Sequence, residues 1–429
     1  MEGRLKMKIS EVRNERLGES VFCAEHPSGL KIFVLPKKDY ESAYALYGVK
    51  YGSIDTSIKN ENGEYEAIPE GTAHFLEHKL FESEDLNAFE RFAKTGASAN
   101  AYTSFERTAY LFKSSSEISE SLEILLDFVQ NPYFTAETVE KEQGIIGQEI
   151  RMYQDQPGWQ LMFNLLRALY AENPVRIDIA GTQDSIARID ADLLHRLYKE
   201  FYNPANMALC IVGCVEPEEI FSIVERCIKG GEGKVIERKF VKESGRPVQK
   251  YVEERFSVAQ KQFYLGFKEP LENPLLTVKE ETATSVMLDA VFGKSSPLFQ
   301  KLLGEGLVDM GFASELFNGY GFSCVMLGGT SADPERAVEL IKSEIEALRK
   351  NGIDPAAFER AKKRNYGRMV MSYNDVGETA NLLMSLCFSG HKPFEELDAC
   401  RELTVEDAQK RLDLLCDECS AVSVISPIN

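Results

Sequence analysis

The sequence repeats one pattern of elements, and this repeat limits the folds that the chain can adopt. In the first half, a strand-like run at 110–112 precedes helical runs that begin at Ser116 and Thr135. In the second half, the same order begins at Val325, Asp333 and Asp354. An internal repeat of this size predicts two domains of the same fold within one chain. A length of 429 residues agrees with two or more domains.

The order of strand-like and helix-like runs indicates the fold class. Segments of alternating apolar residues lie between helical segments, which favours α+β domains with mainly antiparallel sheets packed with helices. A β-hairpin is expected at 21–35. The charged, glycine-containing stretch 229–249 looks like a linker. We therefore expect one domain at 1–228 and a homologous domain at 250–429.

The first half contains the inverted His-x-x-Glu-His pattern that is typical of zinc sites. His74 and His78 lie four residues apart, with Glu77 between them. On a helix these three side chains share one face. Two imidazoles on one face suit tetrahedral zinc, and the carboxylate is then free to hold a water instead of the metal. The alternative is a surface helix that carries these residues by chance, but five histidines in the whole chain make such a match rare.

Catalytic zinc usually has three protein ligands, so the pattern needs a third from elsewhere in the chain. The segment 135–150 is expected to be a helix, with Glu142 and Glu149 seven residues apart on one face. Gly144 and Gly147 interrupt this helix. We interpret them as room for the histidine helix, although ordinary close packing without a metal would explain them equally well.

With these residues the chain resembles the pitrilysin-type, or inverzincin, zinc metallopeptidases, and in particular their small bacterial members. The resemblance implies one zinc ion bound by His74, His78 and Glu149. It also implies that Glu77 is the general base and that Glu142 supports a metal ligand. The implied fold is a clamshell, in which the two related halves face each other across a cleft.

The run 96–104 is similar to the family's Asn-Ala-x-Thr strand. The resemblance therefore implies that Asn100, Ala101 and Tyr102 bind the backbone of a substrate. The alternative for Asn100 is a turn or cap residue beside a strand. In the second half, Arg368 or Met369 aligns with Glu149, so we expect that domain to lack the metal site.

Composition narrows the function classes. A net charge of −19 argues against a nucleic-acid partner. No apolar run reaches the length of a membrane span, so we expect neither a membrane nor export, and a cytoplasmic bacterial protein. Nine cysteines, an odd number, suit a reducing compartment. Cys416 and Cys419 form one Cys-x-x-Cys without a second pair, which favours ordinary thiols over a structural zinc site.

The sequence thus predicts a zinc endopeptidase that hydrolyses short, unfolded peptides held as an added strand. One departure from the family concerns the arginine and tyrosine that stabilise the oxyanion, because Leu303 and Asp309 stand in their places. We therefore expect a homologous sister subunit, as a heterodimer, or a homodimer. The alternative is that Arg364, Tyr366 or Tyr320 fills this role within the chain.

Two other functions stay open. The chain could be a non-catalytic peptide-binding or scaffolding subunit of a peptidase complex, although its intact metal motif argues against this. It could also be a metal hydrolase that acts on a non-peptide substrate.

Overall fold

The computed structural model describes residues 7–60, 62–84, 86–229 and 233–428. Residues 230–232 of the expected linker lie outside this described part. The chain forms two compact units. The first comprises Met1–Ile150, Asp178–Lys239 and Val370–Phe394, and the second comprises Arg151–Ile177, Phe240–Met369 and Glu395–Asn429.

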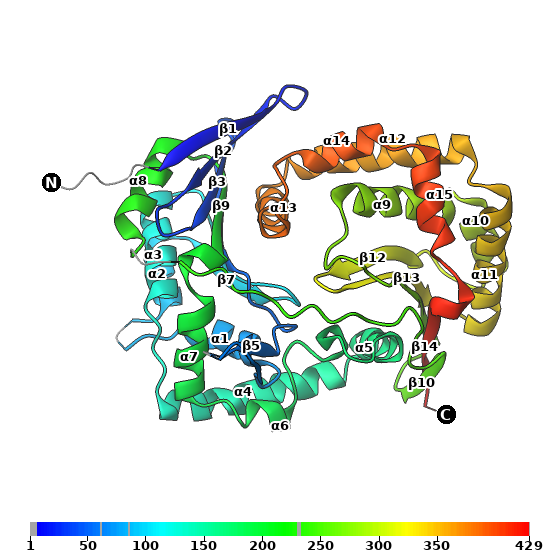
Figure 1. Ribbon diagram of the computed structural model, residues 1–429, viewed down its shortest axis with the longest axis horizontal. Helices are drawn as coiled ribbons and strands as arrows, with labels where there is room; N and C mark the ends of the chain where they lie inside the picture. Colours follow the sequence, from blue (N-terminus) through cyan, green and yellow to red (C-terminus); the bar gives the residue numbers. More distant parts are fainter. Residues whose placement is uncertain (1–6, 61, 85, 230–232, 429) are drawn as a thin grey trace. The chain divides into compact units, whose positions relative to one another are not determined.

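The first unit is built on a seven-stranded sheet in the order β1-β2-β3-β9-β4-β8-β7 (Figure 1). Its strands are β1 (Lys8–Asn14), β2 (Glu19–Glu25), β3 (Lys31–Pro36), β4 (Ala43–Val49), β7 (Ser98–Thr103), β8 (Thr108–Ser114) and β9 (Met207–Gly213). Every neighbouring pair is antiparallel except β3 and β9. The β2–β3 pair is the hairpin expected at 21–35. A small separate sheet consists of β5 (Ser57–Lys59) and β6 (Tyr65–Ala67).

Helices cover both faces of this large sheet. The helices of the first unit are α1 (Thr72–Leu80), α2 (Ala88–Thr95), α3 (Ile118–Gln130), α4 (Ala136–Gln154, whose last residues belong to the second unit), α6 (Gln183–Ile186), α7 (Ala191–Phe201), α8 (Pro217–Cys227) and α13 (Val376–Ser389). α3 packs on β4 and β8, and α13 packs on β4 and β9. All seven residues of β9 are buried as a result. Alternate residues of β4 and β9, such as Tyr47 and Leu209, belong to the core on the α3 side.

The second unit has a five-stranded sheet in the order β10-β14-β11-β13-β12. Its strands are β10 (Tyr251–Phe256), β11 (Gln262–Lys268), β12 (Ala313–Gly319), β13 (Phe322–Thr330) and β14 (Ser420–Pro427). Its helices are α5 (Pro157–Leu169), α9 (Val278–Phe292), α10 (Pro297–Gly304), α11 (Pro334–Asn351), α12 (Pro355–Ser372, which runs on into the first unit), α14 (Glu395–Glu402) and α15 (Val405–Asp413). Short 3-10 turns occur at η1 (Pro174–Arg176), η2 (Pro204–Asn206) and η3 (Asp417–Cys419). In this sheet β10 and β14 are parallel, and the next three neighbouring pairs are antiparallel. The run β3-β9-β4-β8-β7 of the first unit has the same order of one parallel and three antiparallel pairs. The predicted duplication of an α+β domain is therefore confirmed.

Each unit contains a helix from the opposite half of the sequence. α13 packs in the first unit, and α5 packs on β11 and β14 in the second. The compact units therefore differ from the ranges 1–228, 229–249 and 250–429, which describe the sequence repeat and stay a prediction. The physical reason for the difference is that each of these two helices buries its apolar face on a sheet built from the other half.

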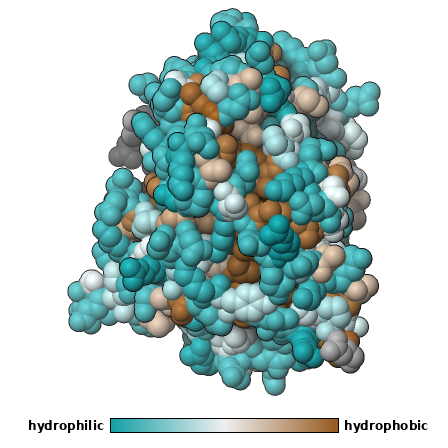
Figure 2. All heavy atoms as spheres, turned by 90° about the vertical axis from the view of Figure 1, so that its right-hand side faces the viewer, coloured by the Kyte–Doolittle hydropathy of each residue, from teal (hydrophilic) through white to brown (hydrophobic). Residues whose placement is uncertain are grey.

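The side of the molecule in Figure 2 is mainly hydrophilic, with hydrophobic residues in patches between the polar ones. Charged residues make up 27% of the sequence, which explains this surface. Among the described residues, no helix combines the length and the apolar character needed to cross a bilayer.

α1 begins at a glycine that the surrounding chain requires. Gly71 has φ 85°, a conformation that residues with a side chain rarely adopt. A Cβ on Gly71 would lie 2.3 Å from the carbonyl oxygen of Ala180, which is far inside contact distance. The segment around Ala180 thus fixes where α1 starts.

Gly71→Ala should lower the free energy of unfolding by more than about 2 kcal/mol, because the clash adds to the strain of a positive φ. Gly18→Ala is the matched control, since Gly18 has φ 68° but no atom within 4 Å of an added Cβ. This control should lose only about 1 kcal/mol. Urea denaturation measures both values, and equal losses would show that Ala180 does not constrain the start of α1.

Candidate metal centre

α1 presents the two histidines and Glu77 because its other residues are held in the core. Phe75, Leu76 and Leu80 are buried in the core of the first unit. α1 also packs against β7, β8 and α7. The remaining face carries His74, Glu77 and His78, as the spacing of these residues predicts.

Glu149 on α4 faces both imidazoles. Its Oε1 lies 3.7 Å from His74 Nε2, and its Oε2 lies 3.5 Å from His78 Nε2. One ligand atom from each of the three residues lies within 4.8 Å of the other two. These separations are longer than ordinary hydrogen bonds, as expected for atoms that surround a common point.

Glu142 contacts His78 on the ring nitrogen that faces away from Glu149. His78 Nδ1 lies 2.9 Å from Glu142 Oε1 in a partly buried contact. Since an ionised carboxylate can only accept, Nδ1 carries the proton and Nε2 keeps its lone pair towards Glu149. Burial lowers the pKa of His78, but the hydrogen bond to Glu142 and the charges of Glu77, Glu142 and Glu149 outweigh it, so the pKa is raised overall.

His74 is suited to a ligand role for a different reason. Its side chain is buried, and burial lowers its pKa to about 3, so the ring is neutral at pH 7. Its Nδ1 is buried and has no hydrogen-bond partner among the described residues. Two imidazoles and one carboxylate form the donor set of a catalytic zinc site, in which a water takes the fourth position. The residues present therefore fit zinc.

Gly144 and Gly147 do not have the role that we inferred for them. A Cβ on Gly144 would meet no atom within 4 Å, and one on Gly147 would lie 3.9 Å from Ile186 in ordinary contact. Neither glycine makes room for the histidine helix. The two helices approach each other through side chains, including the contact between His78 and Glu142.

Glu77 has a partner that the sequence did not identify. Thr103 Oγ1 donates a hydrogen bond of 2.8 Å to Glu77 Oε2, and Thr103 itself lies 3.3 Å from the hydroxyl of Thr108. Burial raises the pKa of Glu77, although the hydrogen bond from Thr103 opposes this shift. Thr103 is the threonine of the Asn-Ala-x-Thr stretch, so the signal was present, but only Asn100–Tyr102 were proposed from it.

Those three residues lie on β7, which is the edge strand of the seven-stranded sheet. Asn100 is exposed, and its Oδ1 accepts a hydrogen bond of 2.9 Å from the amide of Ala101. The hydroxyl of Tyr102 donates to Asn381 Oδ1 on α13 at 2.6 Å. Within the first unit, β7 thus contacts Glu77 through Thr103 and α13 through Tyr102.

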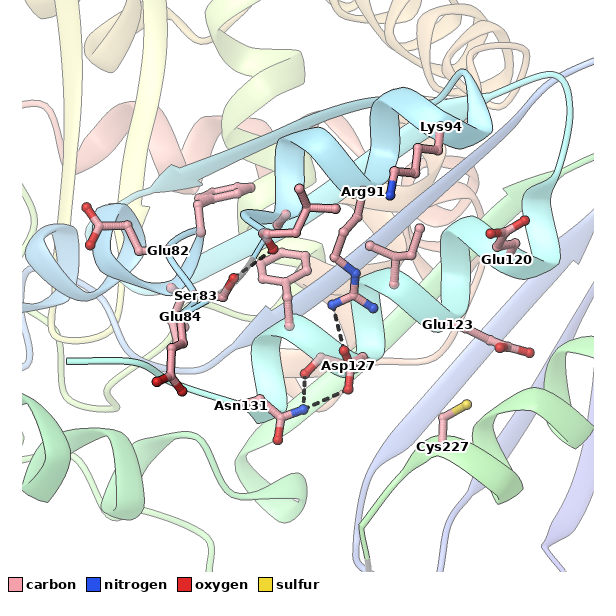
Figure 3. Close-up of a pocket in the computed structure, with 16 residues that line it drawn as sticks. Glu82, Ser83, Glu84, Arg91, Lys94, Glu120, Glu123, Asp127, Asn131 and Cys227 are labelled. Carbon is pink, nitrogen blue, oxygen red and sulfur yellow. Dashed lines mark hydrogen bonds and ion pairs between the residues drawn. The ribbon is translucent and has the colours of Figure 1, made fainter.

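The pocket in Figure 3 is separate from these groups. Its volume is about 810 Å³, and it lies between the C-terminal end of α1 and helices α2 and α3. Of the described residues that line it, none is a candidate zinc ligand. An ion pair of 2.6 Å between Arg91 and Asp127 occupies part of its wall. This pocket is therefore not part of the candidate metal centre.

Comparisons with known proteins agree with the geometry. Residues 60–183, which contain all five proposed metal-centre residues, match the family described as "Insulinase (Peptidase family M16)". Residues 188–365 match the "Peptidase M16 inactive domain".

Individual relatives extend this match to the whole chain. The chain is 41% identical to "Uncharacterized zinc protease YmfH" of Bacillus subtilis, over 94% of this chain and 95% of that protein. It is 28% identical to "Probable mitochondrial-processing peptidase subunit beta, mitochondrial" of Arabidopsis thaliana, over 47% and 37% of the two chains. The crystal structure of a putative M16-like peptidase from Alicyclobacillus acidocaldarius has a TM-score of 0.90 at 34% identity, with full coverage of both chains.

Loss of a ligand should remove the metal. His78→Ala and Glu149→Ala should each abolish stoichiometric zinc, because only two of three donors would remain. Glu142→Gln should retain the site but weaken zinc affinity by roughly 10–100-fold. Elemental analysis and competition with a chromogenic chelator measure these effects.

His195→Ala is the matched control for the histidine variant. His195 lies on α7 and contacts the carbonyl oxygen of Phe134 at 3.3 Å. This variant should bind zinc like the unchanged chain. Full zinc occupancy in Glu149→Ala would contradict the ligand assignment.

Proposed function

The chain belongs to the M16 peptidase family, and we propose from this that it is a zinc-dependent endopeptidase with His74, His78 and Glu149 as its metal ligands. The observation that carries the proposal is the position of Glu77. Its carboxylate shares a helix face with both histidines, yet its Oε2 is bound by Thr103. A carboxylate held beside the ligands, and not among them, suits a general base.

The residues divide the work of peptide hydrolysis between them. Zinc bound by the three ligands would polarise the scissile carbonyl as a Lewis acid and activate a water. Glu77 accepts the proton of the attacking water and later delivers it to the leaving amine. Thr103 occupies Oε2 of Glu77 and leaves Oε1 for this proton. Glu142 positions His78 through Nδ1.

The substrate proposed for this site is a short, unfolded peptide that binds along β7. Within the described part of the chain, β7 has a strand partner on one side only, since β8 is its single neighbour in the sheet. An extended peptide can add to such an edge through backbone hydrogen bonds. Thr103 ends β7 and binds Glu77, so a peptide on this edge would pass the proposed base. Asn100, Ala101 and Tyr102 are the proposed contacts.

We further propose that a homologous sister subunit, or a second copy of the chain, completes the site. Leu303 has no hydrogen-bond donor in its side chain, and the carboxylate of Asp309 accepts from the amide of Gly311 at 2.7 Å. Arg364 is already paired with Asp289 at 2.8 Å. These contacts support a donor from another chain, and one relative is named as a subunit. Tyr320 and Tyr366 are the alternatives within this chain.

A non-catalytic subunit of a peptidase complex is the second candidate function. The description "inactive domain" for the model matched at 188–365 is the observation that favours it. Such a subunit would bind peptides without cleaving them. The following variant separates the two functions.

Glu77→Gln should lower hydrolysis of an unstructured peptide by about 100–10,000-fold, because the amide cannot accept the proton. Bound zinc should stay near stoichiometric, since Glu77 is not a ligand. Glu84→Gln is a matched control, because Glu84 is an exposed glutamate in the segment after α1. Full peptidase activity in Glu77→Gln would overturn the assignment of Glu77 as the base. If the unchanged, zinc-loaded chain is inactive both alone and with its homologue, the result would favour the non-catalytic subunit.

Binding along β7 should depend on alternate amides of the substrate. A single N-methyl group on an amide that faces β7 removes one hydrogen bond, worth roughly 1 kcal/mol, or about fivefold in kcat/KM. Moving the methyl group by one residue should restore cleavage, because that amide faces away from β7. A stable folded protein should resist cleavage. Equal loss for both methylated peptides would argue against an added strand.

If the oxyanion donor comes from a sister chain, the isolated protein should turn over slowly. Addition of a co-purifying or genome-adjacent homologue should raise kcat by about 100–1,000-fold. Steady-state assays of the chain alone, of the homologue alone and of the mixture measure this effect. High turnover by the isolated chain, unchanged by the homologue, would refute the proposal of a divided site.

A further inference from the structure

Cys416 and Cys419 form the one sequence motif that peptide hydrolysis leaves unused. They lie in the connection between α15 and β14, in the second unit. Both are free thiols. The Cys416 thiol donates to Cys419 Sγ, and the two sulfur atoms are 3.1 Å apart. A disulfide has a sulfur–sulfur distance of about 2.05 Å, so the two atoms need to approach by only about 1 Å to form a bond.

The loop that carries the two thiols is held in this shape by its own hydrogen bonds. The Cys419 amide donates to the Cys416 carbonyl at 3.2 Å. The Cys419 thiol lies 3.0 Å from the same carbonyl and 3.3 Å from that of Leu414. These contacts close a tight turn, so the thiols stay adjacent without help from a ligand.

Charged groups anchor Asp417, one of the two residues between the thiols. Lys342 on α11 forms an ion pair of 2.5 Å with Asp417, and Lys250 lies 3.9 Å from the same carboxylate. The hydroxyl of Ser420 donates to the Asp417 carbonyl at 3.0 Å. The turn is therefore held by contacts from α11, from the residue before β10 and from β14. Fixing a dithiol in this way favours bond formation within the pair over reaction of each thiol with a separate molecule.

The two thiols differ in access to solvent. Cys416 is partly exposed, whereas Cys419 is 5% exposed and belongs to the core of the second unit. Burial, followed by the hydrogen bond from Cys416, raises the pKa of Cys419. An external reagent would thus meet Cys416 first. Cys419 is placed to react with Cys416 from the buried side.

We propose that Cys416 and Cys419 are a reversible redox site that reacts with small disulfides of the glutathione class. The Cys416 thiolate attacks one sulfur of the small disulfide, forms a mixed disulfide and releases one small thiol. Cys419 then loses its proton and attacks Cys416 Sγ, which releases the second small thiol. Two protein thiols are oxidised to one disulfide, and the small disulfide is reduced to two thiols. This site is independent of the proposed peptidase function.

The sequence allows a direct test. No lysine or arginine lies between Arg411 and residue 429, so trypsin releases Cys416 and Cys419 together on one peptide that begins at Leu412, and residues 412–429 contain no other cysteine. The full chain is incubated with oxidised glutathione, acid-quenched, alkylated with N-ethylmaleimide, digested and weighed by mass spectrometry. We expect this peptide to lose both alkylation sites and to be lighter by two hydrogens than the reduced peptide. Dithiothreitol should restore both sites.

Two lone cysteines of the same chain are internal controls. Cys214 is exposed and should acquire glutathione without forming an internal bond, and Cys210 is buried and should remain unreacted. Cys419→Ser should trap a single glutathione on Cys416, whereas Cys416→Ser should leave Cys419 unmodified. Two glutathione or two maleimide groups on the oxidised peptide of the unchanged chain would overturn the proposal. Glutathione on Cys419 in Cys416→Ser would overturn the order of attack.

Discussion

The hydrogen bond between His78 Nδ1 and Glu142 Oε1 joins α1 to α4, and the geometry of the candidate metal centre depends on it. It fixes the tautomer of His78 and directs Nε2 towards Glu149. Since Glu142 and Glu149 lie on the same helix, the contact at one also sets the position of the other. A buried carboxylate without this partner would be strongly unfavourable, so the bond stabilises the packing of the two helices as well as the site.

The metal-centre residues differ in how far the sequence alone could assign them. Helical spacing alone put His74, Glu77 and His78 on one face, because a period of 3.6 residues is a local property. Glu149 could be assigned only through a family resemblance, since its approach to α1 depends on tertiary packing. Thr103 was missed for a similar reason: its contact with Glu77 depends on where β7 ends beside α1. Gly144 was misinterpreted, because a helical glycine that faces open space looks the same in sequence as one that faces a partner.

The fold class was accessible because alternation and helical periodicity are also local, and the repeat revealed the duplication. The sequence could not show which helices belong to which compact unit. The apolar face of α13 has the same pattern whichever sheet it covers, and only the structure shows it on β4 and β9. The Cys416–Cys419 pair gives a parallel case. A Cys-x-x-Cys spacing is compatible with separate thiols, a metal site or a redox pair, and the sulfur–sulfur distance of 3.1 Å is the observation that supports the proposed redox pair.

The placement of α13 has a consequence for the order in which the chain can fold as it is synthesised. β4 and β9 leave the ribosome long before residues 376–389, so one face of the nascent sheet has no cover during that time. Leu46 and Cys210, which pair across these strands, are fully buried in the finished protein. Gly48 lies on the same face, and a Cβ there would be 2.9 Å from Met384 Sδ of α13. The first half of the chain therefore cannot complete its fold until most of the second half has been translated. During that time the uncovered apolar face of its sheet can bind chaperones or misassemble.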